Sequence, residues 1–125
     1  MDVNPAMTTG DESPQCQFCA LEYRPKGWHS ESSGTAPVIL LALRDEAGHV
    51  RVVVHPLLTS LVRKEDLVYL QSLLQDFLTR AEFDPGGLFN QLSSLGVGPL
   101  VTQAVGEDLR DYPTLQELAS EFEPL

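Results

Sequence analysis

Apolar and polar positions between residues 38 and 55 follow the pattern of two consecutive strands. Residues 38–43 (VILLAL) are continuously apolar, which favours a strand covered on both faces. Residues 50–54 (VRVVV) place three valines on one face of a second strand. Between them, Asp45 at the first turn position and Gly48 at the last favour a type I turn in which Gly48 takes a positive φ. The pattern predicts an antiparallel hairpin over 38–55.

A helical period begins near residue 64. Apolar residues recur at spacings of three and four, which predicts one stripe of an amphipathic helix over about 64–82. The stripe consists of Leu67, Leu70, Leu74, Phe77 and Ala81, and Val68, Leu73 and Leu78 widen it. The stripe is expected to face the hydrophobic core.

Three shorter elements follow. Asp84 is a favourable N-cap and Pro85 a favourable first helical residue, so a second helix is predicted over 85–95. Residues 100–105 indicate a third strand. The sequence from Thr114 to Glu117 has the form of a capping box, which predicts a terminal helix over 114–122.

Together these elements predict one α+β domain over residues 36–125. Its small antiparallel sheet combines the hairpin 38–55 with the strand 100–105, and the helices pack on one face. Residues 1–35 are predicted to be a flexible or loosely packed N-terminal segment, because they are mostly polar and lack a period. Segment 38–43 is apolar on both sides, so its second face needs a cover. Candidates are the N-terminal segment around Phe18 and Trp28, or a second subunit.

Charge is distributed unevenly along the 125 residues, whose net charge is −10. Residues 65–125 hold eleven acids and two bases, whereas residues 36–64 hold two acids and four bases. An acidic half repels phosphate backbones, so nucleic acid and anionic membranes are not expected as partners. No apolar run reaches the roughly 18–20 residues that cross a bilayer, and residues 1–15 lack the features of a secretory signal. A cytoplasmic location is therefore expected.

The two cysteines carry the first candidate chemistry. Cys16 and Cys19 are spaced as in zinc sites, and His29 lies at a permissible distance along the chain. A second CxxC pair and an HxxxH pair are both missing, so a zinc-stabilised N-terminal clip is an alternative hypothesis; otherwise no cofactor is expected. Redox chemistry at the pair is less favoured, because no strand precedes Cys16 as in thioredoxin-like sites.

Catalytic signatures are weak. The chain lacks the G-x-S-x-G, HExxH, Walker A and G-x-G-x-x-G motifs. His55, at the end of a predicted strand, is the best lone base. A small enzyme with an unrecognised site therefore stays open as an alternative, although the sequence favours a non-catalytic protein.

Residues 107–123 suggest a surface for a protein partner. Six acids and one arginine surround apolar side chains in this segment, so Leu109, Asp111, Tyr112 and Leu115 are predicted to contact a partner with a basic or apolar surface. The alternative is that these apolar residues fill the protein's own core. The leading hypothesis is a small acidic interaction or accessory module that binds another protein or a second copy of itself.

Overall fold

The computed structural model describes residues 17–29 and 35–125, and within them three strands are followed by three helices, two further strands and a C-terminal helical region. In chain order the elements are β2 (Gln17–Tyr23), β3 (Val38–Arg44), β4 (Val50–Val54), α2 (Leu58–Leu61), α3 (Lys64–Phe83), α4 (Pro85–Leu92), β5 (Gly96–Val97), β6 (Leu100–Gly106), the 3₁₀ turn η1 (Leu109–Asp111), α5 (Pro113–Glu121) and β7 (Glu123–Pro124).

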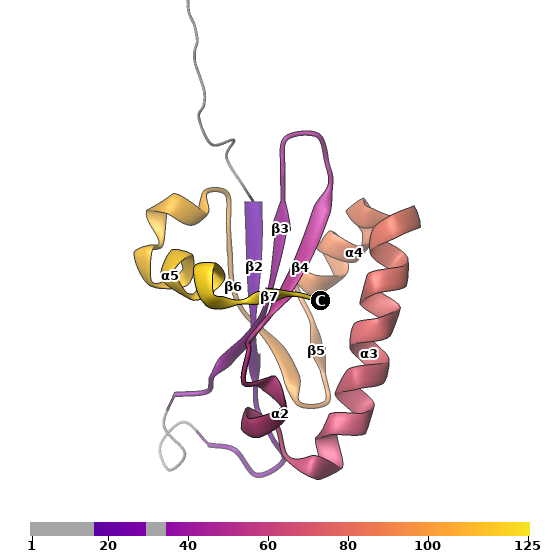
Figure 1. The fold of residues 1–125 in the computed structure, drawn as a ribbon, viewed down its shortest axis with the longest axis vertical. Helices are drawn as coiled ribbons and strands as arrows, with labels where there is room; N and C mark the ends of the chain where they lie inside the picture. Colours follow the sequence, from indigo (N-terminus) through magenta and orange to yellow (C-terminus); the bar gives the residue numbers. More distant parts are fainter. Residues whose placement is uncertain (1–16, 30–34) are drawn as a thin grey trace, which may run out of the picture.

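The strands form one antiparallel sheet in the order β5-β6-β2-β3-β4-β7. Helices α3 and α4 lie on one side of this sheet and α5 lies on the other (Figure 1). The α+β class, the antiparallel sheet and the hairpin are as the sequence predicts. Gly48 takes a φ of 91° in the hairpin turn, and its N–H donates to the Asp45 carbonyl.

The boundary predicted at residue 36 is wrong for the segment that forms β2. Strand β2 lies between β6 and β3 rather than outside the domain, and residues Phe18 to Leu21 are fully buried. Strand 100–105, expected beside the hairpin, therefore pairs with β2 instead. Seven residues with two small side chains carry little periodic signal, and only burial on both faces identifies them as a central strand. Residues 1–16 lie outside the described part of the chain.

The larger core lies between the sheet and helices α3 and α4. Leu70, Leu74 and Phe77 of α3 are buried against alternate residues of β2, including Cys19 and Leu21. The predicted apolar face of this helix is thus confirmed as buried. One member of the widened set differs, because Val68 is 75% exposed.

A second core covers the opposite face of the sheet, so the prediction that the helices pack on one face is wrong for α5. Leu115 and Phe122 contact Phe18, Leu41 and other apolar residues that point away from α3. The physical reason is that residues 38–43 are apolar on both faces of the strand, and both faces must be buried. The chain supplies that cover from its own C-terminal helix.

Helix ends differ from the predictions by a few residues. Helix α4 ends at Leu92 instead of residue 95, and Leu95 then donates its N–H to the Thr102 hydroxyl at 2.7 Å. The capping box predicted at Thr114 is not formed, because Pro113 is already the first residue of α5 and Tyr112 occupies the N-cap.

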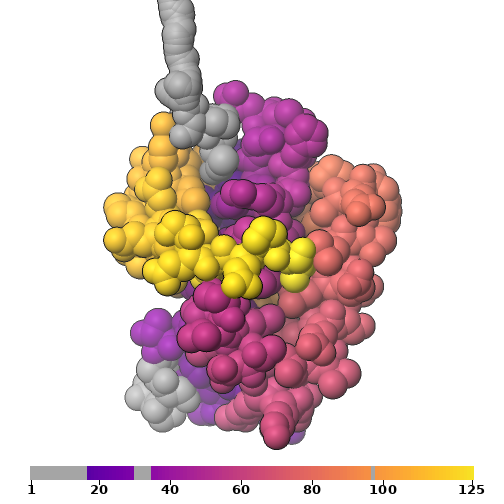
Figure 2. All heavy atoms as spheres, viewed as in Figure 1, coloured from indigo at the N-terminus to yellow at the C-terminus, as the bar shows by residue number. Residues whose placement is uncertain are grey.

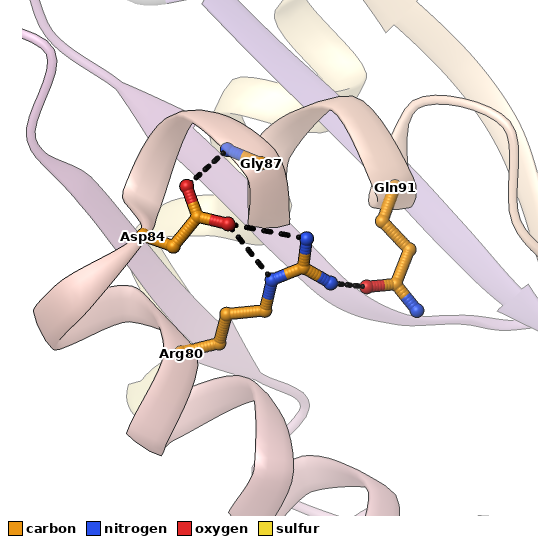
Figure 3. A network of polar contacts seen from close by, with 4 residues as sticks. All are labelled: Arg80, Asp84, Gly87 and Gln91. Carbon is orange, nitrogen blue, oxygen red and sulfur yellow. Dashed lines mark hydrogen bonds and ion pairs between the residues drawn. The ribbon is translucent and has the colours of Figure 1, made fainter.

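Asp84 links α3 to α4, as predicted for an N-cap. Its carboxylate accepts the Gly87 N–H at 3.1 Å and the Arg80 guanidinium at 3.3 Å, and Arg80 also donates to Gln91 (Figure 3). A Cβ at Gly87 would lie 2.2 Å from the Asp84 carboxylate, whereas a Cβ at Gly86 would meet nothing within 4 Å. The two glycines are therefore not equivalent.

This difference predicts different outcomes for two alanine substitutions. Gly86→Ala should raise the free energy of unfolding by about 0.5–1 kcal/mol, because alanine loses less backbone entropy in a helix. Gly87→Ala should show no such gain, because the displaced Asp84 carboxylate gives up a cap that contributes about 1 kcal/mol. Urea denaturation of both variants measures the difference, and equal stabilities would contradict the assigned cap.

Candidate functional site

The structure places Cys19 and His29, two residues of the predicted zinc clip, in different environments. Cys19 is buried in the larger core, and burial raises the pKa of its thiol to about 12. His29 is exposed, in the loop that follows β2, and Cys16 lies outside the described residues. Where the chain is described, no three His, Cys, Asp or Glu side chains lie close enough to hold a metal ion. A neutral thiol in the core is a structural residue, so the zinc clip stays a sequence prediction.

Most of the predicted partner contacts in the C-terminal region serve the fold. Leu115 is 7% exposed and Leu109 is half-buried, both within the second core. The Tyr112 ring is partly exposed but packs edge-on against Phe18, with ring centroids 4.9 Å apart. Asp111 is exposed. The two leucines thus belong to the protein's own core, as the alternative interpretation held, and Tyr112 borders it.

His55 has a local structural role. Its Nδ1 accepts the N–H of Leu57 at 2.9 Å, and its ring centroid lies 5.4 Å from that of Phe122. A base for catalysis needs a ring nitrogen directed at substrate. In His55, Nδ1 is instead engaged by the Leu57 N–H in the turn that follows β4.

Exposed apolar side chains occur instead on the outer face of α3. Val68 is 75% exposed and Phe83 is 73% exposed, and α3 runs along one border of the molecule (Figure 1). Three uncharged polar residues stand between them. We call this row the α3 stripe; it consists of Val68, Ser72, Gln75, Thr79 and Phe83.

The α3 stripe is continuous and uncharged over about 22 Å, since 15 residues rise about 1.5 Å each. Acidic side chains at exposed positions flank it, namely Glu65, Asp76 and Glu82. The helical period could have revealed the stripe. Val68 lies nine residues before Phe77, which corresponds to about two and a half turns of helix. The two side chains must therefore face opposite sides. Figure 2 shows α3 at the surface of the molecule, in rose and salmon.

A second constellation lies where β2 ends. Glu22 is 4% exposed, and its carboxylate accepts a hydrogen bond from Nε of Arg24. The Arg24 guanidinium carbon lies 4.7 Å from the centroid of the Trp28 ring. A buried carboxylate is unfavourable unless it is paired, so Glu22 needs Arg24. The arginine is in turn held on two sides, by a carboxylate and by an aromatic face.

The loop that carries Arg24 is anchored to the rest of the domain. The backbone N–H of Arg24 donates to the Pro99 carbonyl at 2.7 Å. The backbone N–H of Trp28 donates to the Pro25 carbonyl across a turn in which Gly27 has a φ of 86°. Arg63, just before α3, donates to the Lys26 carbonyl. A hollow of about 330 Å³ lies beside this loop. Its lining residues are Arg24, Lys26, Asp66, Gly98 and Pro99.

The neighbouring Tyr23 connects β2 to the start of α3. Its hydroxyl donates to the Asp66 carboxylate at 2.6 Å and accepts the Arg63 N–H at 3.1 Å. Burial, together with the hydrogen bond to Asp66, raises the pKa of Tyr23 above its ordinary value. The wall of the hollow is thereby tied to both the sheet and α3.

Comparison with known proteins does not assign this chain to a family. No protein-family model, no curated protein and no solved structure matches it. A membrane-spanning helix is not found in the described part of the chain, where each helix is too short or too polar to cross a bilayer. Function must therefore be inferred from the two surfaces, the α3 stripe and the surroundings of Arg24.

Proposed function

We propose that this protein is a non-catalytic interaction module that binds another protein through the α3 stripe. The observation that carries the proposal is the pair of large apolar side chains, Val68 and Phe83, exposed at the two ends of an uncharged helix face. Outer faces of surface helices usually carry charged residues. A partner would bury two apolar anchors without desolvating a charge along the line between them.

The charges around the stripe indicate the chemistry of the partner. Glu65, Asp76 and Glu82 flank the row, and Lys64 is the one exposed base of α3. A second copy would bring the same acids against them, and like charges in contact are unfavourable. The surface therefore favours a different protein, with apolar side chains bordered by lysine or arginine.

Site-specific photo-crosslinking in the cells that make the protein tests this proposal. A photoreactive side chain at position 83 should give an adduct with one other polypeptide, and Val68→Glu should abolish it. A photoreactive side chain at the exposed Gln103, on β6, is the matched control and should give no such adduct. An adduct with the mass of a homodimer, or equal adducts from both positions, would contradict the proposal.

Binding of the purified partner supplies the quantitative test. Val68→Glu and Phe83→Glu should each weaken binding at least about tenfold, because each places a charge where an apolar anchor is buried. Gln103→Glu adds the same charge elsewhere and should leave affinity unchanged. Affinity should also fall with ionic strength if basic side chains meet the acidic border.

A further inference from the structure

The geometry at the end of β2 points to a second binding site, and we propose that Arg24 binds the carboxylate of a ligand there. This site shares no residue with the α3 stripe and does not rest on the function proposed for it. It consists of Arg24 with its two supports, Glu22 and Trp28, and the adjoining hollow.

Arg24 is prepared for such a contact by its own environment. The guanidinium group has five N–H donors in a planar fork, and the Glu22 carboxylate engages only the one on Nε. Within residues 17–29 and 35–125, the terminal nitrogens of Arg24 have no hydrogen-bond partner. The side chain is 42% exposed, so the group is reachable from solvent although one edge is buried. The Trp28 ring lies against the guanidinium group, with 4.7 Å between its centroid and the guanidinium carbon, and restricts the side chain, which lowers the entropy lost on binding.

Neighbouring charges favour a monoanion. Lys26 lines the hollow with Arg24, and Arg63 lies beside the Lys26 carbonyl. Counted against the acids Glu22 and Asp66, these three bases leave an excess of one positive charge here, in a chain whose net charge is −10. Asp66 also lines the hollow, and it would repel a doubly charged phosphate more strongly than a carboxylate.

A carboxylate also matches the geometry of the arginine. Two parallel N–H···O bonds from the terminal nitrogens suit the two oxygens of a carboxylate, and such paired bonds are among the stronger ones in proteins. Lysine at this position would keep the charge but lose the fork. Arg24→Lys therefore separates recognition by geometry from general attraction by charge.

Trp28 offers a direct readout, because it is the one tryptophan in the chain and lies against Arg24. Its fluorescence should change and saturate when the protein is titrated with acetate or with a short peptide that ends in a free carboxylate. The same peptide with an amidated C-terminus should give no change. Equal affinities for acetate and the peptide would identify a small organic acid as the ligand type, and tighter binding of the peptide would identify a chain terminus.

Variants complete the test. Arg24→Lys should weaken carboxylate binding at least about tenfold, whereas Arg51→Gln, at an exposed arginine on β4, should leave it unchanged. If the Arg24 variant fails to fold, the NMR shift of the Arg24 Nε–H in the unmodified protein gives the answer, since it must move on adding acetate. Tighter binding of inorganic phosphate, equal binding of the amidated peptide, or no response to any probe would overturn the proposal.

Discussion

Phe77→Asp should lower the free energy of unfolding by about 4 kcal/mol or more. Phe77 is 2% exposed and packs in the core between α3 and the sheet. Removing a buried aromatic side chain alone costs about 3–5 kcal/mol, and the new carboxylate would have no partner in this apolar site. Small domains are stable by only about 5–15 kcal/mol, so the variant should be largely unfolded or melt at a much lower urea concentration.

Asp76→Ala is the matched control for this prediction. Asp76 is the preceding residue on the same helix and is exposed, so its replacement should change stability by less than about 0.5 kcal/mol. Urea denaturation followed by circular dichroism measures both variants. A near-neutral Phe77→Asp would mean that the predicted stripe faces solvent, and the assignment of the core would then be wrong.

Phe18→Ala should destabilise the protein by about 3–5 kcal/mol, because Phe18 is fully buried on the face of the sheet that α5 covers. The Phe18 ring also contacts Tyr112 and lies where a Cβ on Gly106 would have to go, at 2.5 Å. Alanine would therefore leave a cavity where β2, β6 and the C-terminal region now pack against one another. This variant tests whether residues near position 18 belong to the domain.

Gln17→Ala serves as the control, since Gln17 is the adjacent residue of β2 and is exposed. Its effect should stay within about 0.5 kcal/mol. Thermal denaturation compares the two variants under one condition. If both variants melted like the unmodified protein, β2 would contribute little to the fold, and the domain would begin near residue 36 as the sequence alone suggests.

The interaction surface shows where reasoning from sequence succeeded and where it did not. The sequence predicts a partner surface of apolar anchors with acidic neighbours around Leu109 and Tyr112, yet Leu109 packs in the second core and the partly exposed Tyr112 ring packs against Phe18. The pattern also predicts Val68 on the buried face, although its position on the helix opposes Phe77 and its side chain is exposed. Composition shows that apolar side chains are present in a segment. It does not show which of them are buried in the folded protein.

The Arg24 site could not have been assembled from the sequence. Glu22, Arg24 and Trp28 lie within seven residues, but their spacing matches no known motif. Their meaning depends on the burial of Glu22, which follows from the central place of β2 in the sheet. An exposed charged pair in a loop would be weak evidence for a binding site, whereas a buried carboxylate that holds an arginine is stronger evidence.

Local sequence alone determined the hairpin of β3 and β4, the turn at Gly48, the Asp84 cap and the buried side of α3, because each depends on residues close in sequence. Only the tertiary structure decided that β2 is central and that α5 covers the second face of the sheet. Those two features pair segments about 80 to 100 residues apart, as when Phe18 meets Gly106 and Leu115. Long-range pairing is driven by the burial of apolar surface, which is non-directional and leaves no period of its own in the sequence.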